Sequence, residues 1–154
     1  MDDGRAAERA DGSRANVEFD GIQAGVLVGA ELAPFREDDG HSRITTAGPD
    51  LLLLPDAAQV VAIVVHELAT NAAKYGALST PHGTVRLSWE RTDGPEGSSL
   101  EVHWREEGGP SVTPGGRRGF GSRLMQFGVT KGLGGTVQFN FEPAGLRVSI
   151  VLPV

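Results

Sequence analysis

The chain of 154 residues contains no cysteine, which excludes a disulfide framework, thiolate catalysis and cysteine-ligated zinc sites. It also lacks an apolar run of about 18 residues, the length that would indicate a membrane-spanning helix. The four leucines at 51–54 are too short for that role and predict a buried strand ended by Pro55. Because the N-terminus has no apolar signal-peptide core, we expect a cytoplasmic protein whose sequence makes no direct membrane contact.

Acidic residues are absent from residues 108–141, although the whole chain has 20 acidic residues, 14 basic residues and a net charge of −6. This stretch contains Arg117, Arg118, Arg123 and Lys131. A local cationic segment in an acidic chain favours a compact anionic ligand. It disfavours nucleic acid, whose binding proteins typically present a broad basic face and a high pI.

The same stretch is rich in glycine and leads into a predicted helix at 122–130. A glycine-rich loop before a helix exposes backbone N–H groups, and these bind phosphate together with the helix dipole. Ser122 either adds a hydroxyl group or caps the helix. The alternative interpretation is a flexible surface loop, since Gly-x-Gly before a helix is a weak signal.

A polar stripe is predicted on an earlier helix. Glu67 lies four residues before Asn71, and Asn71 lies three before Lys74, so the three side chains share one helical face. The stripe indicates a site for a charged ligand with a metal ion. The alternative is an amphipathic helix with a solvated polar face. An adjacent apolar stripe can face a core, and it consists of Val60, Val64, Leu68, Ala72 and Tyr75.

A third candidate residue stands at the end of a predicted strand. The alternation from Leu100 to Trp104 indicates the strand, and Glu106 follows it just before two glycines. A carboxylate at this point can accept a hydrogen bond from an exocyclic amine such as N6 of adenine, and glycine lets a flat ring approach the backbone. The alternative is an ordinary strand end entering a turn.

In this order the three segments resemble the catalytic ATP-binding domain of bacterial sensor histidine kinases, within the GHKL ATPase superfamily. More narrowly, the chain is similar to the HWE subfamily. The marks are a histidine in the N-box, here His66 at the start of residues 66–72, and a Trp-x-Glu, here Trp104 and Glu106. Residues 119–124 match the second glycine box. The resemblance covers residues 17–154, and we expect residues 1–16 to be disordered.

The resemblance implies ATP and Mg²⁺ as cofactors. Asn71 would bind Mg²⁺, Lys74 would neutralise phosphate and Glu106 would bind adenine. Glu67 would orient or deprotonate the phosphoacceptor, with His66 as the second catalytic residue. The loop at 107–121 would be the mobile ATP lid. The other nucleotide-binding residues that the resemblance implies are Tyr75, Gly108, Arg117, Arg118, Gly119, Gly121, Ser122 and Leu124.

The phosphoacceptor helix of a full histidine kinase is missing from the sequence pattern. Of His41, His66, His82 and His103, only His66 lies on a predicted helix, and it belongs to the N-box. We therefore expect transfer of the ATP γ-phosphoryl group to a histidine on a separate dimerisation and phosphoacceptor domain, with a response regulator as an indirect partner. The alternatives are a nucleotide-binding pseudokinase or partner-binding module, and an anti-sigma-factor-type serine kinase of the same fold. ATP turnover with an added acceptor domain distinguishes them.

The pattern predicts one α+β domain: a two-layer α/β sandwich whose mixed sheet is covered on one face by helices. Two helices are expected at 21–34 and 56–76, the second capped by Asp56. Between them, residues 41–54 predict a hairpin that turns at 48–50. Strands are expected at 84–91, 99–105, 135–142 and 145–152.

Overall fold

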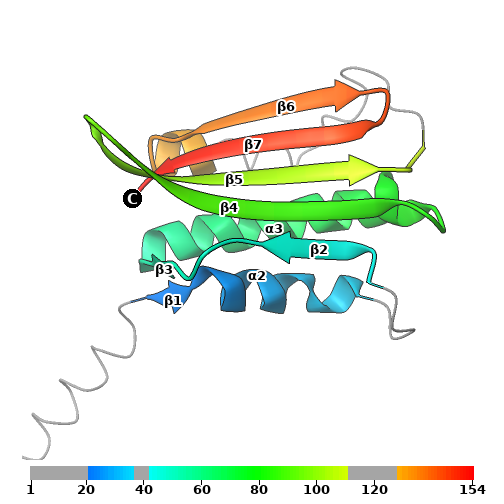
Figure 1. Ribbon diagram of the computed structural model, residues 1–154, viewed down its shortest axis with the longest axis horizontal. Coiled ribbons are helices and arrows are strands. Elements are labelled where there is room, and N and C mark those ends of the chain that lie inside the picture. The colour runs from blue at the N-terminus through cyan, green and yellow to red at the C-terminus, as the bar shows by residue number, and fades with distance from the viewer. Residues whose placement is uncertain (1–20, 37–41, 111–127) are drawn as a thin grey trace, which may run out of the picture.

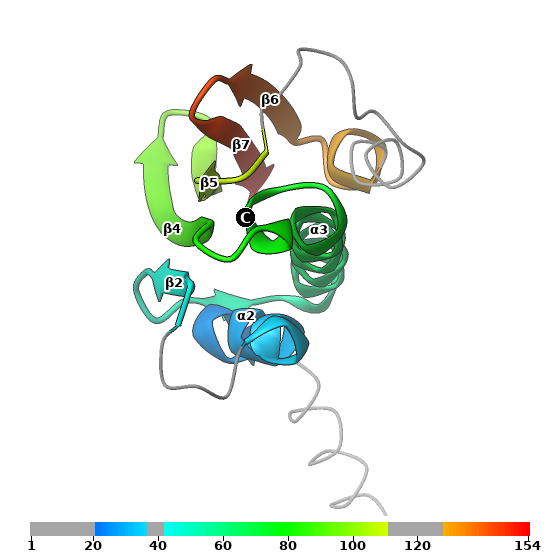
Figure 2. The same ribbon diagram turned by 90° about the vertical axis from the view of Figure 1, so that its right-hand side faces the viewer.

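The computed structural model describes residues 21–36, 42–110 and 128–154, which form a mixed sheet with its helices on one face (Figures 1 and 2). The α+β class and the layer arrangement predicted from the sequence are confirmed. The predicted disorder of residues 1–16 falls outside the described residues. So does most of the predicted lid and third helix.

Five strands make the main sheet, in the order β2-β4-β5-β7-β6. Strand β2 pairs in parallel with β4, whereas the other neighbours are antiparallel. The β4–β5 hairpin is paired as far as Gly94 and Gly97, so Pro95 and Glu96 form a two-residue turn. The four strands predicted after residue 80 are confirmed. The bounds are β2 Ile44–Ala47, β4 Thr84–Gly94, β5 Gly97–Glu107, β6 Thr136–Glu142 and β7 Gly145–Pro153.

Two helices, α2 (Ala24–Leu32) and α3 (Pro55–Lys74), cover the sheet, and a 3₁₀ turn η1 (Ala33–Phe35) extends α2. In both views α3 lies between α2 and the π-helical turn η3 (Gly128–Gly132). The apolar face of α3 packs on the sheet because its buried residues recur every three or four positions. They are Ala57, Val61, Val64, Val65, Leu68, Ala69 and Ala72.

The predicted apolar stripe of this helix is confirmed at its centre and fails at one end. Val64, Leu68 and Ala72 are buried, and Val60 is partly buried. Tyr75 is 53% exposed, because it follows the last helical residue and its backbone has left the helical conformation.

The predicted hairpin at residues 41–54 is wrong. Strand β2 pairs with β4, whereas β3 (Leu52–Leu53) pairs with β1 (Ile22–Gln23) in a separate two-stranded sheet. The segment between them crosses from the sheet to the helical layer. The indole N–H of Trp89 donates to the Pro49 carbonyl at 2.9 Å, and Ala24 N–H donates to the Leu51 carbonyl at 2.8 Å. Because these bonds hold the segment to β4 at one point and to α2 at the next, β2 and β3 do not pair with each other.

Two further predictions near residue 54 are wrong. Of the four leucines, only Leu53 is buried, because β3 is two residues long and successive side chains point to opposite faces. Asp56 is not the cap of α3: Leu54 holds the N-cap position without a side-chain bond, and Pro55 begins the helix. Asp56 lies in the first turn of α3, where its carboxylate interacts favourably with the positive end of the helix dipole.

The start of the predicted third helix lies outside the described residues, and its described end belongs to η3. Val129 in this turn is fully buried, and its carbonyl accepts a hydrogen bond from Gly135 N–H at 2.9 Å. Among the described residues, no helix combines the length and apolar character that crossing a bilayer requires.

Candidate functional site

The polar stripe predicted on residues 67–74 lies on one flank of α3. Glu67 and Asn71 are partly buried beside the apolar face, and Lys74 is exposed in the last turn. Because a helix advances about 100° per residue, the three side chains follow one line beside the buried face. The structure therefore brings together Asn71, predicted to bind Mg²⁺, Glu67, predicted to act on the phosphoacceptor, and Lys74, predicted to neutralise phosphate.

His66 lies on a different flank, although it precedes Glu67 directly. Its Nδ1 is 3.7 Å from Glu31 Oε2 on α2, and its ring meets Phe35 edge-on with 6.3 Å between centroids. On an ideal helix His66 and Asn71 are about 140° apart. The structure therefore separates His66 from the stripe and places it at the junction of α2 and α3.

Glu106 is a buried carboxylate, only 5% exposed. Its Oε1 accepts a hydrogen bond from Ala77 N–H at 2.9 Å, and its Oε2 accepts one from the Trp104 indole N–H at 2.9 Å. The first bond ties the end of β5 to the 3₁₀ turn η2 (Ala77–Ser79), three residues beyond α3. Glu106 thus joins the strand to the end of the helix that carries the polar stripe.

This approach of strand to helix requires glycine at one position. A Cβ atom on Gly76 would lie 2.0 Å from Glu106 Oε1, well inside the contact limit. Beyond Glu106, Gly108 has a φ of +76°, which side-chain-bearing residues rarely adopt. The two glycines therefore fix the site from both sides: one admits the carboxylate, and the other turns the chain away from it.

The loop after η2 is held by groups that the sequence pattern did not single out. The Arg43 guanidinium donates to the carbonyls of Thr80 and Gly83, the latter at 3.3 Å. The Thr80 hydroxyl lies 2.9 Å from the Gly108 carbonyl and accepts a hydrogen bond from Gly83 N–H at 3.2 Å. These bonds fix the loop against the end of β5.

The Trp104 bond to Glu106 was also missed as a contact, although the sequence carried a signal for it. Residues two apart on a strand point to the same face, so a Trp-x-Glu on a strand places indole and carboxylate side by side. The bond between Ala77 and Glu106 had no such signal, because the two residues are 29 apart in sequence. The same holds for the bonds from Arg43 to Thr80 and Gly83, which are 37 and 40 residues away from it.

Six of the predicted nucleotide-binding residues belong to the predicted lid or to the predicted helix that follows it. Arg117, Arg118, Gly119, Gly121, Ser122 and Leu124 lie outside the described residues. Tyr75 and Gly108, the other predicted nucleotide contacts, directly follow α3 and β5.

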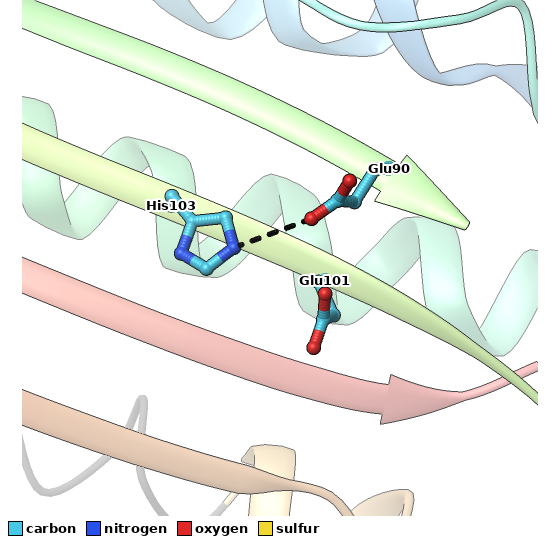
Figure 3. A group of neighbouring side chains, drawn as sticks. All are labelled: Glu90, Glu101 and His103. Carbon is cyan, nitrogen blue, oxygen red and sulfur yellow. Dashed lines mark ion pairs between the residues drawn. The ribbon is translucent and has the colours of Figure 1, made fainter. Parts of the chain in front are cut away.

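A second group of possible ligands lies on the opposite face of the sheet (Figure 3). Among the described residues, Glu90, Glu101 and His103 bring potential metal-ligand atoms within 4.8 Å of one another. His103 Nε2 is 3.9 Å from Glu90 Oε1, and both side chains are about half exposed or more. Glu90 and Glu101 are direct cross-strand partners. Among the described residues, no feature other than this proximity marks the group as a metal site.

The chain is similar to two curated proteins along much of its length. It is 36% identical over 150 residues to a blue-light-activated histidine kinase of Brucella anthropi, which covers 97% of this chain and 30% of that protein. It is 39% identical over 131 residues to blue-light-activated histidine kinase 1 of Erythrobacter litoralis, covering 83% of this chain and 35% of the relative. The chain therefore spans about a third of the length of these relatives. No protein-family model matches it.

Solved structures share the fold. The histidine kinase domain of the Erythrobacter litoralis EL346 blue-light-activated histidine kinase matches 86% of this chain and 61% of its own, with a TM-score of 0.65 at 20% identity. The catalytic domain of the histidine kinase ThkA matches 86% of this chain and 92% of its own, with a TM-score of 0.64 at 16% identity. In sequence the chain is therefore similar to part of these blue-light-activated histidine kinases, and its fold is that of histidine-kinase catalytic domains.

Proposed function

We propose that this chain binds Mg-ATP and transfers the γ-phosphoryl group to a histidine on a separate phosphoacceptor domain. The observation that carries the proposal is the buried Glu106 carboxylate, which is bonded to Ala77 just beyond the helix that bears Asn71 and Lys74. A candidate adenine-binding group and candidate phosphate-binding groups thus lie on elements that are joined directly. The similarity to proteins named histidine kinases supports the same function.

Glu106 is suited to bind the adenine amine. Each carboxylate oxygen can accept two hydrogen bonds, and within the described residues each oxygen of Glu106 accepts one. Acceptor capacity therefore remains for an N6 amine, which donates. Guanine carries a carbonyl oxygen at the equivalent position, and that oxygen would face the carboxylate unfavourably. The site is therefore expected to prefer ATP to GTP.

The polar stripe fits a magnesium ion and a phosphate chain. Mg²⁺ prefers oxygen ligands, and Asn71 offers a carboxamide oxygen on the same face as the Glu67 carboxylate. When bound, the ion would neutralise charge on the phosphates. Lys74 supplies a further positive charge, and Glu67 is the candidate base for the acceptor. The lid residues Arg117 and Arg118 stay predictions.

The acceptor histidine is assigned to another domain because His66 is badly placed for the reaction. Phosphoryl transfer requires the nucleophile to attack in line with the leaving oxygen. His66 is fixed within α3 and contacts Glu31 and Phe35 on the α2 side, away from Asn71. Its side chain cannot reach the opposite flank unless the helix unfolds. Contact with Phe35 instead favours a role in holding α2 against α3.

The test is calorimetric titration with ATP and Mg²⁺, followed by incubation with γ-labelled ATP in the presence and absence of a histidine phosphoacceptor domain. Asn71→Ala removes the carboxamide oxygen and should abolish Mg²⁺-dependent binding while the fold is retained. Asn140→Ala is the matched control, since Asn140 is exposed on β6 and should leave binding unchanged.

Acid-labile label on the acceptor domain supports the proposal, and none is expected on the isolated chain. Acid-labile label on the chain alone that is lost in His66→Ala would overturn the assignment of the acceptor. Acid-stable label on serine would indicate a serine kinase of the same fold. ATP binding without transfer would indicate a nucleotide-binding module, and no binding at all would refute the function.

A further inference from the structure

The Trp104 indole holds the Glu106 carboxylate from the side opposite Ala77. Trp104 is 1% exposed and Glu106 is 5% exposed, so both ends of this bond are shielded from water. The two donors contact different oxygens, each at 2.9 Å. A carboxylate gripped at both oxygens cannot rotate, and this fixes the direction of its remaining lone pairs. Hydrogen bonds to charged groups in such surroundings are among the stronger ones in proteins.

We propose that Trp104 is a positioning residue for nucleotide binding: its indole N–H orients Glu106 so that the carboxylate is set to accept the adenine amine before the nucleotide arrives. The inference rests on the proposed function, because it assigns a purpose to the geometry of the adenine-binding carboxylate. Trp104 itself would not touch the reacting phosphates. Its contribution is to remove the freedom that Glu106 would otherwise lose on binding.

The chain provides its own control for this inference. It has two tryptophans, and the second, Trp89 on β4, is also buried and also donates its indole N–H, here to the Pro49 carbonyl at 2.9 Å. Trp104→Phe and Trp89→Phe therefore remove the same group from the same core. They differ in the partner that is left behind: Glu106 in one case and a backbone carbonyl in the other.

Binding of ATP and GTP to both variants and to Glu106→Ala should be measured by calorimetry at saturating Mg²⁺. We expect Trp104→Phe to weaken ATP binding about tenfold, the equivalent of one charge-assisted hydrogen bond, and to leave GTP binding nearly unchanged. Trp89→Phe should bind ATP as the parent chain does. In the Glu106→Ala background, Trp104→Phe should cause no additional loss, since the residue acts through Glu106.

A spectroscopic measurement keeps the inference testable if Trp104→Phe does not fold. Two tryptophans give two indole N–H signals in a ¹H–¹⁵N correlation spectrum, and Trp89→Phe identifies which is which. ATP should shift the Trp104 signal as the amine draws electron density from Glu106, and should move the Trp89 signal less. A Trp104 signal that does not move on ATP saturation contradicts the inference.

The two proposals fail in different ways. If the parent chain binds no ATP, the proposed function fails and the inference falls with it. If the chain binds ATP through Glu106 but Trp104→Phe binds ATP as tightly as the parent does, the inference alone is overturned. The same holds if Trp104→Phe and Trp89→Phe weaken ATP binding equally, since the effect then belongs to core packing.

Discussion

The two faces of strand β5 place carboxylates in opposite circumstances. Towards α3, Glu106 is buried and held by two N–H donors. Towards solvent, Glu101 stands directly across from Glu90, and Glu107 forms an exposed ion pair of 2.5 Å with Arg105. The residues alternate along one strand, so the pleat alone separates them. A carboxylate on β5 is therefore either buried and hydrogen-bonded or solvated, according to the parity of its position.

Removing the buried carboxylate should have the largest effect. Glu106→Ala leaves the N–H groups of Ala77 and Trp104 buried without their acceptor, so we expect a loss of about 1–3 kcal/mol in the free energy of unfolding for each of the two donors. ATP affinity should fall by at least about tenfold. Glu107→Ala, on the outer face, should change stability by less than about 0.5 kcal/mol. Urea unfolding measures both changes in the free energy of unfolding. Equal losses in Glu106→Ala and Glu107→Ala would contradict the difference argued between the two faces of β5.

Glu106→Gln sharpens the same comparison. An amide has one acceptor oxygen and one NH₂ group, so its NH₂ would face either Ala77 N–H or the Trp104 indole. We expect this nearly isosteric change to cost almost as much stability as Glu106→Ala. A Glu106→Gln variant as stable as the parent in urea unfolding would show that Glu106 does not accept both hydrogen bonds, from Ala77 N–H and from the Trp104 indole, in solution.

A methyl group at Gly76 should have the next largest effect. Its Cβ would lie 2.0 Å from Glu106 Oε1, so Gly76→Ala must push the strand and helix apart, and we expect a loss of about 1–3 kcal/mol. Gly29→Ala is the control, because its Cβ has no neighbour within 4 Å and it lies inside α2. That change should stabilise by about 0.5–1 kcal/mol. Thermal unfolding checks both, and the same sign for both would contradict the packing argument.

On the outer face, removing a charge should stabilise the chain slightly. Glu90 and Glu101 are opposed like charges, so Glu101→Gln should gain about 0.2–1 kcal/mol in the free energy of unfolding at low salt. The gain should shrink as salt rises, because exposed charges are screened. Glu96→Gln in the turn is the control. A gain that persists at high salt would point to a cause other than repulsion.

The smallest effect is expected at the end of the β4–β5 hairpin. Hydrogen bonds from Ser98 and Arg91 and the charge of Arg91 lower the pKa of Asp93 below 3.8. A depressed pKa means that the stabilisation is present above the unfolded-state value and is lost as the pH falls through the folded value. Carboxyl chemical shifts of Asp93 followed by NMR should show a raised pKa in Ser98→Ala, and no change there would contradict the assignment.

Much of the fold followed from local pattern. The long strands β4, β5, β6 and β7 were predictable because alternation and Gly-Pro turns are local signals. The hairpin at 41–54 was mispredicted because the pairing of short strands is decided by distant partners. Ile44 pairs with Val85, and Leu53 pairs with Ile22. No local feature of the segment carried that choice.

The candidate site divides in the same way. Spacing alone placed Glu67, Asn71 and Lys74 on one flank of a helix, and strand parity carried the unused signal that Trp104 lies beside Glu106. Only the tertiary structure decided that Glu106 is tied to Ala77, that Gly76 must lack a side chain, and that His66 turns to α2. The physical reason is that helical and strand periodicity fix directions within one element. Burial and hydrogen-bond partners depend on which elements meet, and that is settled when the whole core packs.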